Sequence, residues 1–282
     1  MAHDAIHAAL LAWFASAQPK PLLVIAGPCV IEDQATNDLI ASTLCRVCDE
    51  LKFSLVFKAS FDKANRSSVH SRRGLGIERG LTELARIREK FQVPVTTDVH
   101  EPSQAAIAAC SVDLLQIPAF LCRQTDLLVA AATTRRPVNV KKGQFMSPQE
   151  MENVLVKLRE GGCAFPMLTE RGTFFGYNRL VNDFIGVGDL MDLGAPVCFD
   201  ATHSTQLPGG SGTATAGRPE RAPLLARAAI AAGVDAIFLE CHPTPASSAS
   251  DAATIQPLAS VEQLLRSLAA IRRAIESSSA AI

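Results

Sequence analysis

The sequence repeats one pattern eight times: a short aliphatic or β-branched run, a few polar or glycine residues, and a helical pattern. Short apolar runs of this kind are typical of parallel strands that are buried on both faces. Amphipathic stretches separate or follow the runs, at 81–91, 148–162, 221–233 and 261–275. The eight runs lie at 22–27, 54–60, 93–99, 113–119, 137–142, 166–171, 196–201 and 235–240.

Eight strand–helix units in 282 residues predict an α/β fold, a (β/α)8 TIM barrel, which normally needs roughly 250 residues. No linker-like stretch interrupts the alternation. We therefore expect residues 1–282 to form a single domain, with a helical N-terminal extension over 1–20 that covers it. An open doubly wound sheet is the alternative. It is disfavoured because the first run, LLVIAGPCVIED, lacks the GxGxxG turn of dinucleotide-binding sheets.

The charge balance and the hydropathy exclude several classes of partner. The chain has 27 basic and 28 acidic side chains, so it has no net positive charge with which to displace counterions from a nucleic acid or to bind anionic lipid. No apolar run approaches the roughly 20 residues of a membrane span. The apolar N-terminus lacks the positive charge that begins a secretory signal. We expect a cytoplasmic protein without a nucleic-acid or membrane partner.

The eight cysteines are scattered along the chain, unlike the dense pattern of a small secreted disulfide scaffold. Cys45 and Cys48 form the one CxxC pair, and no second pair is present to complete a zinc ribbon. Both lie in a helical pattern, IASTLCRVCDELKF. We therefore interpret Cys45 and Cys48 as inert residues of a helix rather than as a redox pair.

A polar or titratable residue ends or follows each of the eight runs. In a closed parallel barrel the carboxyl ends of the strands meet at one mouth, where active sites form. One such residue is often only structural, but eight at the same mouth predict a site for chemistry. They are Cys29, Lys58 with Ser60, Asp98, Gln116, Lys141, Glu170 with Arg171, His203 and Glu240.

Four of the basic residues, together with one hydroxyl, form a cationic set. Because the chain as a whole carries no positive excess, a local cluster of this kind indicates a bound anion, most simply phosphate. Solvated surface charge is the alternative, and it is disfavoured because most of these residues end apolar strands. The set is Lys58, Ser60, Lys63, Lys141 and Arg171.

A second set combines one thiol, one imidazole and two carboxylates. Such donors can hold a divalent transition metal with a position open for water or substrate. The donors are far apart in the sequence, so only the barrel would bring them together, and His100, Cys241 and His242 are competing candidates beside the same strand ends. The set is Cys29, His203, Glu240 and Asp251.

Three long loops follow predicted strands. The glycine-rich segment 205–220 is either a mobile lid or a long connection. Segment 61–76 is dense in Lys, Asn, Arg and Ser and could bind a second anionic or polyhydroxy ligand. Segment 244–253 carries Asp251.

Six blocks of the sequence resemble the 3-deoxy-D-manno-octulosonate 8-phosphate synthase family, also called 2-dehydro-3-deoxyphosphooctonate aldolase. The resemblance covers about residues 21–270. It implies a homotetrameric barrel enzyme that condenses phosphoenolpyruvate with D-arabinose 5-phosphate, releases phosphate, and serves lipopolysaccharide inner-core synthesis. The blocks are KASFDKANRSS (58–68), TDVHEPSQA (97–105), QIPAFLCRQTDLL (116–128), NVKKGQF (139–145), FDATHSTQLPGG (199–210) and LECHP (239–243).

The resemblance also implies a role for each matched residue. Phosphoenolpyruvate would be held by Lys58, Ser60, Lys63, Gln116, Ala119, Lys141 and Arg171. The sugar phosphate would be held by Asn65, Arg66, Ser67 and Asp98, with Arg66 on its phosphate. Lys63, Asp98 and His203 are the implied catalytic residues.

The family divides into members with Cys at the first strand end, which depend on a metal, and members with Asn there, which do not. AGPCVIE has Cys29 at that position, which resembles the metal-dependent class. The implied ligands are then Cys29, His203, Glu240 and Asp251. Fe(II), Zn(II), Mn(II) and Co(II) all accept such donors, so the sequence leaves the metal open.

Three other functions remain as alternatives. The related enzyme that makes 3-deoxy-D-arabino-heptulosonate 7-phosphate from erythrose 4-phosphate shares the barrel and phosphoenolpyruvate. It typically has KPRTSP-like residues where this chain has KANRSS. A non-catalytic phosphate- or metal-binding barrel would need decayed strand ends, and a metal-dependent hydrolase would favour HxH on the first strand; the sequence has neither.

Overall fold

Eight parallel strands form a closed ring in the computed structural model, which describes residues 2–65, 73–211 and 214–279. Neighbouring strands pair in chain order, and β12 closes the barrel by pairing with β1. This confirms the predicted TIM barrel, and each strand lies on one of the eight predicted runs. The strands are β1 (Leu23–Gly27), β2 (Ser54–Lys58), β3 (Val95–Asp98), β4 (Leu114–Ile117), β5 (Val138–Lys141), β6 (Pro166–Glu170), β9 (Val197–Asp200) and β12 (Ala236–His242).

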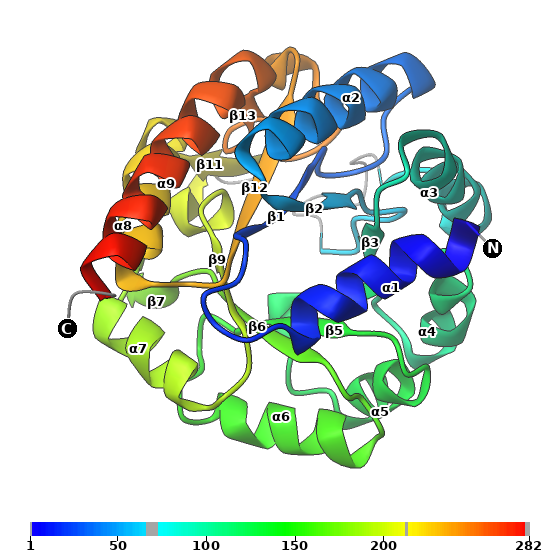
Figure 1. Cartoon of the computed structure of the whole chain (residues 1–282), viewed down its shortest axis with the longest axis horizontal. Coiled ribbons are helices and arrows are strands. Elements are labelled where there is room, and N and C mark those ends of the chain that lie inside the picture. Colours follow the sequence, from blue (N-terminus) through cyan, green and yellow to red (C-terminus); the bar gives the residue numbers. More distant parts are fainter. Residues whose placement is uncertain (1, 66–72, 212–213, 280–282) are drawn as a thin grey trace.

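Helices surround the barrel (Figure 1). The amphipathic stretches predicted at 81–91, 148–162, 221–233 and 261–275 each correspond to a helix, with ends that differ by up to four residues from the structure. The largest differences are in α3 and α9, where polar terminal turns hide the apolar periodicity. The helices are α2 (Gln34–Leu51), α3 (Ile77–Phe91), α4 (Pro102–Ala109), α5 (Thr125–Thr133), α6 (Met151–Glu160), α7 (Phe184–Asp192), α8 (Ala222–Ala232) and α9 (Leu258–Ser279).

Most of the barrel strands contribute to two apolar cores because successive side chains point to opposite faces. On β1, Val24 and Ala26 face the surrounding helices, whereas Leu23 and Ile25 point into the barrel. Both faces are buried, which explains why the strands appear in the sequence as continuous apolar runs.

The N-terminal helix α1 (Ala2–Ala15) covers the amino-terminal end of the barrel. Leu10, Trp13 and Phe14 pack against residues that point into the barrel, such as Ile25 and Phe238. The Trp13 indole Nε1 donates a hydrogen bond of 2.7 Å to the carbonyl oxygen of Pro21, so the helix is tied to the chain that enters β1. We call this apolar end of the barrel the floor and the carboxyl end of the strands the mouth.

In the described part of the chain, two antiparallel hairpins and four short 3-10 helices lie outside the strand–helix pattern. The predicted loop or lid at 205–220 is largely the hairpin of β10 (Gln206–Ser211) and β11 (Ala214–Gly217). Its glycines and threonines obscured the strand signal. The other elements are the hairpin of β7 (Thr173–Gly176) and β8 (Arg179–Val181), the short strand β13 (Gln256–Pro257), η1 (Ala119–Leu121), η2 (His203–Thr205), η3 (Pro219–Arg221) and η4 (Pro245–Ser247).

Cys45 and Cys48 lie on α2, as predicted, and neither is part of a disulfide. Burial raises the pKa of Cys45 to about 11 and that of Cys48 to about 12, with a smaller contribution from Asp49. Both thiols therefore stay protonated at neutral pH, which makes them poor nucleophiles. Within the described residues, no helix combines the length and apolarity of a membrane span.

Candidate active site at the carboxyl ends of the strands

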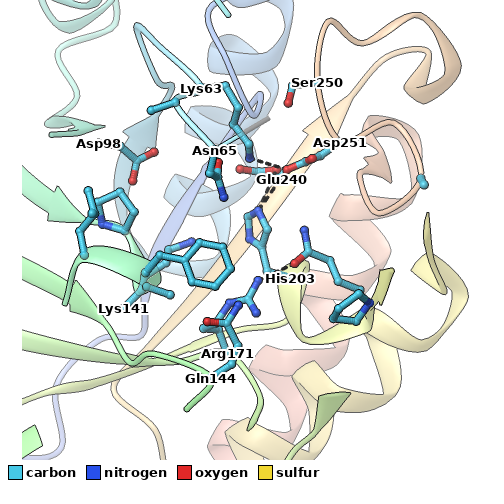
Figure 2. A pocket seen from close by; sticks show the side chains of 18 of the residues that line it. Lys63, Asn65, Asp98, Lys141, Gln144, Arg171, His203, Glu240, Ser250 and Asp251 are labelled. Atoms are coloured by element: carbon cyan, nitrogen blue, oxygen red, sulfur yellow. Dashed lines mark hydrogen bonds and ion pairs between the residues drawn. The ribbon is translucent and has the colours of Figure 1, made fainter. Parts of the chain in front are cut away.

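A cavity of about 820 Å³ opens at the mouth of the barrel. Side chains from the barrel strands and from the loops after them line it, and Figure 2 shows how several of them lie around it. Most of the predicted strand-end residues therefore meet at this mouth. Among the residues that line the cavity are Lys58, Lys63, Asn65, Asp98, Ala119, Lys141, Arg171, His203, Glu240 and Asp251.

The loop after β1 is held close to β2 by a glycine. A Cβ atom at Gly27 would collide with the carbonyl oxygen of Lys58, so a larger residue would push the two strands apart. The chain then returns over the barrel, where the backbone nitrogen of Ser60 donates to the carbonyl oxygen of Cys29 at 3.2 Å. This path places the Cys29 thiol over the barrel mouth.

Lys58 is a buried cation that is already paired. Its Nζ lies 3.0 Å from Oε1 of Glu240, 3.5 Å from Oδ2 of Asp98 and 2.8 Å from the carbonyl oxygen of Cys29. Burial would lower the pKa of Lys58, but the carboxylates of Glu240 and Asp98 outweigh it and raise the pKa above its ordinary value. The ammonium therefore stays charged and links β2 to β3 and β12.

Lys141 and His203 share a second buried carboxylate, Asp200. The Lys141 Nζ and the His203 Nδ1 lie 2.6 Å and 2.7 Å from the same Oδ2 oxygen. Burial would raise the pKa of Asp200, but the charges of His203 and Lys141 lower it well below its ordinary value. Because Asp200 accepts a hydrogen bond from Nδ1, it leaves Nε2 of His203 free to act as a ligand or proton carrier in the cavity.

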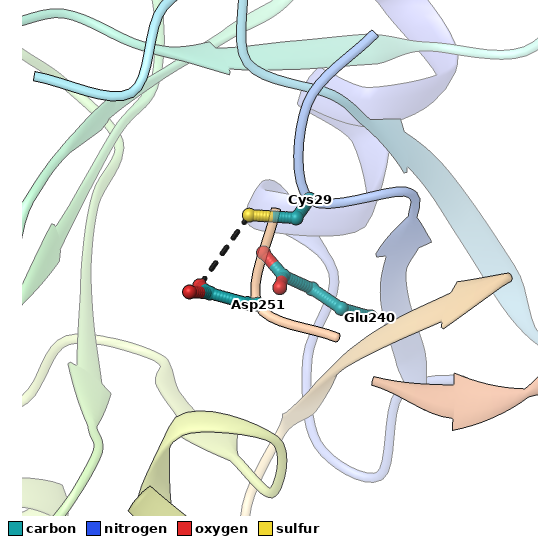
Figure 3. Close-up of side chains that lie close together, drawn as sticks. All are labelled: Cys29, Glu240 and Asp251. Atoms are coloured by element: carbon teal, nitrogen blue, oxygen red, sulfur yellow. Dashed lines mark hydrogen bonds between the residues drawn. The ribbon is translucent and has the colours of Figure 1, made fainter. Parts of the chain in front are cut away.

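Cys29, Glu240 and Asp251 offer three buried donor atoms within 4.8 Å of one another (Figure 3). The His203 Nε2 lies 3.4 Å from Oδ2 of Asp251 and 3.6 Å from Oε2 of Glu240. All four predicted ligands therefore come together. Among the described residues, Oε2 of Glu240 has no hydrogen-bond partner. A thiol, an imidazole and two carboxylates, one of which has a buried oxygen without a hydrogen bond in the described chain, fit a divalent transition metal.

Lys63 supplies the cation next to this group. Its Nζ lies 2.5 Å from Oδ2 of Asp251 and 3.2 Å from Sγ of Cys29. Burial would raise the pKa of Asp251, but the charges of Lys63 and His203 bring it well below its ordinary value. Burial and the nearby carboxylates of Asp251 and Glu240 raise the pKa of the Cys29 thiol. A metal at Cys29 would therefore have to displace the thiol proton.

Arg171 carries a buried donor that nothing in the described chain satisfies. Its Nη2 donates to Oε1 of Gln206 at 2.6 Å, whereas Nη1 has no hydrogen-bond partner. Burial lowers the pKa of Arg171, with Asp200 and Glu170 opposing the shift. A buried guanidinium nitrogen without a partner is costly, and an anion in the cavity would relieve that cost.

Two predicted substrate residues lie beneath the cavity rather than in its wall. The Ser60 hydroxyl donates to Oδ2 of Asp98, and the Gln116 Nε2 donates to Oδ1 of the same carboxylate at 2.7 Å. Gln116 also accepts a hydrogen bond of 3.1 Å from Nδ2 of Asn139. Both residues therefore hold Asp98 in place. Arg66 and Ser67 lie outside the described residues.

The sequence reasoning missed three polar residues at the mouth. Asp200 orients His203, Gln206 binds Arg171, and Gln144 lines the cavity with an Oε1 atom that lacks a partner among the described residues. Asp200 ends the seventh predicted run and could have been found by the strand-end rule. Gln144 and Gln206 lie in the blocks NVKKGQF and FDATHSTQLPGG, where no strand end marks them.

The chain is similar to proteins with known names over most of its length. The model of the "DAHP synthetase I family" matches residues 14–277. The 2-dehydro-3-deoxyphosphooctonate aldolase of Cyanothece sp. is 53% identical over 256 residues, which cover 91% of this chain and 94% of the relative. The proteins of that name from Desulfotalea psychrophila and Granulibacter bethesdensis are 52% and 54% identical. Those alignments cover 91% and 88% of this chain, and 92% and 88% of the relatives.

These relatives confirm the resemblance that the six sequence blocks indicated. Both the family match and the relatives span the strands and the mouth described above. The chain belongs to the DAHP synthetase I family.

Proposed function

We propose that the chain condenses phosphoenolpyruvate with D-arabinose 5-phosphate and water to give 3-deoxy-D-manno-octulosonate 8-phosphate and inorganic phosphate. One observation carries the proposal: a chain 53% identical to a 2-dehydro-3-deoxyphosphooctonate aldolase over 91% of its length gathers cationic and metal-ligating side chains at one mouth. Relatives with this printed name favour arabinose 5-phosphate over erythrose 4-phosphate, although the family description names the erythrose-dependent class.

The proposed reaction forms one carbon–carbon bond and releases one phosphate. The methylene carbon of phosphoenolpyruvate attacks the aldehyde carbon of the open-chain sugar, and the aldehyde oxygen takes up a proton. The water oxygen adds to the enol carbon and loses one proton. The bond between that carbon and the phosphate oxygen then breaks, phosphate is released, and the added oxygen becomes the carbonyl oxygen of the product as it loses its second proton. Positioning two reactants in this way can supply several kcal/mol of the barrier.

The cationic side chains hold the anionic groups of phosphoenolpyruvate in this proposal. Arg171 is best suited to a phosphate or carboxylate oxygen because its Nη1 is buried and unpaired within the described chain. Lys141 and Lys63 add positive charge, and Ala119 lines the same cavity. Lys58 also lines the cavity and holds Glu240, whereas Ser60 and Gln116 act from behind the wall by holding Asp98.

The sugar phosphate lies on the other side of the cavity in this proposal, near Asn65 and Asp98. Arg66 and Ser67 follow Asn65 in the chain, and we assign Arg66 to the phosphate of the sugar. Asp98 is ionised, so it accepts hydrogen bonds from sugar hydroxyls. Lys63, Asp98 and His203 are the groups that we propose hold or move protons at the reacting atoms.

We further propose that the enzyme belongs to the metal-dependent class, with Cys29, His203, Glu240 and Asp251 as ligands of Fe(II), Zn(II), Mn(II) or Co(II). Such an ion supplies a Lewis acid that orients the aldehyde or acidifies bound water. Cys29→Ala is expected to lose the metal that copurifies with the protein. Cys198→Ala, which removes an equally buried thiol from inside the barrel, is the matched control. Equal metal contents in the two variants would contradict the assignment.

Residues 1–282 act as one domain in a cytoplasmic homotetramer in our proposal, within lipopolysaccharide inner-core synthesis. The free state of all eight cysteines supports a reducing compartment. The β7–β8 hairpin exposes Phe174, Phe175 and Tyr177, with 46%, 60% and 88% of their surfaces accessible, which supports self-association. Sedimentation equilibrium tests the subunit count.

Phosphate release from phosphoenolpyruvate tests the reaction itself. With arabinose 5-phosphate as acceptor we expect at least a hundredfold higher kcat/KM than with erythrose 4-phosphate, since a mismatched acceptor leaves buried polar groups unpaired. Release without any acceptor controls for simple hydrolysis. Equal rates with the two sugars, or a preference for erythrose 4-phosphate, would overturn the proposed substrate.

A further inference from the structure

Glu32 joins the two loops that carry Cys29 and Asp251. It lies three residues after Cys29, in the segment that follows β1. Its Oε1 accepts hydrogen bonds of 2.9 Å from the backbone nitrogen of Ala249 and 3.2 Å from the hydroxyl of Ser248. These two residues immediately precede the turn to Asp251. One carboxylate oxygen therefore spans the gap between two segments that are distant in sequence.

The backbone of Glu32 is itself held firmly. The Asn37 Oδ1 accepts from the backbone nitrogen of Glu32 at 3.1 Å, and the Asn37 Nδ2 donates to the carbonyl oxygen of Glu32 at 3.0 Å. Asn37 is fully buried on α2 and also donates to Oε1 of Glu83 on α3 at 3.0 Å. These contacts fix the backbone of Glu32, so its side chain can position the loop that carries Ala249 and Asp251.

Hydrogen bonds hold the turn at Asp251 from both sides. Asp251 has φ of 51°, in the left-handed region, which aspartate adopts more readily than most residues other than glycine. On its far side, the Asp251 carbonyl oxygen accepts from the backbone nitrogens of Thr254 at 2.8 Å and Ile255 at 3.2 Å. The contacts of Glu32 hold the near side. The carboxylate of Asp251 is thereby directed at Cys29, 3.4 Å from its Sγ.

The strand that supplies the third donor also approaches Glu32. His242 lies on β12 two residues beyond Glu240, and its Nε2 is 3.8 Å from Oε1 of Glu32. Glu32 thus lies against all three segments that bear Cys29, Glu240 and Asp251. The Cys29 side chain is fully buried in a small cluster with Val30, Ile255 and Ala249, so the same loop also covers the thiol.

We propose that Glu32 is a positioning residue that sets the distance between Cys29 and Asp251, and thereby the affinity of the metal site. It acts through its contacts with the 248–251 turn and does not contact the ion. This inference rests on the proposed metal site for its functional meaning, but its geometric part concerns the protein alone.

Two substitutions separate the effect of the length of the Glu32 side chain from the effect of its charge. Glu32→Asp keeps the charge but shortens the side chain by one carbon–carbon bond, roughly 1.5 Å, so the oxygen no longer reaches Ala249. Glu32→Gln removes the charge but keeps an acceptor oxygen at full reach. We expect Glu32→Asp to weaken Co(II) binding at least tenfold, in the range of other changes behind metal ligands, and Glu32→Gln to stay within about twofold of the wild type. Competition with a chromophoric chelator measures both.

Asp33→Ala is the matched control for lost stability. Asp33 is the next residue, and its side chain caps α2 by accepting from the backbone nitrogen of Thr36 at 3.0 Å. Its loss destabilises the same segment without removing a contact to the 248–251 turn. A weaker affinity in Glu32→Gln than in Glu32→Asp, or equal affinities in Glu32→Asp and Asp33→Ala, would overturn the inference.

A metal-free readout distinguishes failure of the inference from failure of the proposed metal site. Alkylation of Cys29 by iodoacetamide, followed by peptide mass spectrometry in the presence of a chelator, reports how well the turn covers the thiol. We expect at least tenfold faster alkylation in Glu32→Asp and near wild-type rates in Glu32→Gln and Asp33→Ala. If the wild type bound no metal, only the metal site would fail. Unchanged alkylation in Glu32→Asp would overturn the positioning role itself.

Discussion

The two ends of the barrel are built from the same strands but in opposite ways. At the floor, Trp13 and Phe14 of α1 pack on side chains such as Ile25 and Phe238 that point into the barrel. At the mouth, the same strands end in buried charges such as Lys58, Asp200 and Glu240. Apolar burial stabilises the folded state, whereas buried charges cost desolvation that their partners only partly return. The comparison indicates that the floor stabilises the fold and that the mouth is organised for ligands.

The mouth also contains buried polar atoms that have no hydrogen-bond partner in the described part of the chain. Among the described residues, Arg171 and Gln144 each leave one buried polar atom without a partner at the cavity. Such atoms are rare in folded proteins because each one costs free energy. Their presence in the wall of the cavity, where a ligand can reach them, supports a binding role rather than a structural one.

The largest expected effect is at the floor. Trp13→Ala removes a buried indole and its hydrogen bond to Pro21, so the free energy of unfolding should fall by about 3–5 kcal/mol. The KM for phosphoenolpyruvate should stay near the wild-type value, because α1 lies at the other end of the barrel. Urea unfolding and steady-state kinetics measure the two quantities. Trp13→Phe, which keeps most of the volume, is the control. A large change in KM with little loss of stability would break the distinction between the ends.

Arg171→Ala should show the reverse pattern. In the proposed reaction the guanidinium holds an anionic group of phosphoenolpyruvate, so we expect its removal to lower kcat/KM for phosphoenolpyruvate about 100- to 1000-fold. The free energy of unfolding should change little, because the variant also loses a buried unpaired nitrogen. Arg171→Lys should recover part of the activity by restoring the charge. Unchanged kinetics in Arg171→Ala would remove this residue from the site.

A smaller effect is expected from the pH dependence of stability. Burial would raise the pKa of Asp98, but Lys58 and Lys141 hold it below its ordinary value near 4. Because the pKa is lower in the folded state, this carboxylate adds stability above pH 4 and loses that contribution as the pH falls. Asp98→Asn should therefore show a shallower loss of unfolding free energy between pH 5 and pH 3. Denaturant titrations at several pH values measure the unfolding free energy of both proteins. If that free energy fell equally with pH in the wild type and in Asp98→Asn, the lowered pKa would be contradicted.

The sequence predicted the floor and the strands better than the details of the mouth. Runs such as 22–27 and 235–240 are apolar on both faces, and that property depends only on the residues themselves. The order of strands followed from the barrel closure. The positions of Lys58, Lys141, His203 and Glu240 followed in turn, because strand ends of a parallel barrel meet at one mouth.

The sequence did not predict which polar side chains pair with one another. Ser60 and Gln116 follow or lie in strands as predicted, yet they bind Asp98 beneath the cavity. The hydrogen-bond partner of a polar side chain depends on how strands that are distant in the chain pack together. The contact between Glu32 and Ala249 spans 217 positions and has no local pattern at all. The β10–β11 hairpin was missed because glycine and threonine give a weak strand signal.

A crystal structure with phosphoenolpyruvate and Co(II), phased at the cobalt absorption edge, tests the central claim most directly. The account predicts an anomalous peak within coordination distance of Cys29, His203, Glu240 and Asp251, and an anionic group of phosphoenolpyruvate paired with Nη1 of Arg171. A cobalt peak away from Cys29, or phosphoenolpyruvate bound outside the mouth of the barrel, would contradict it.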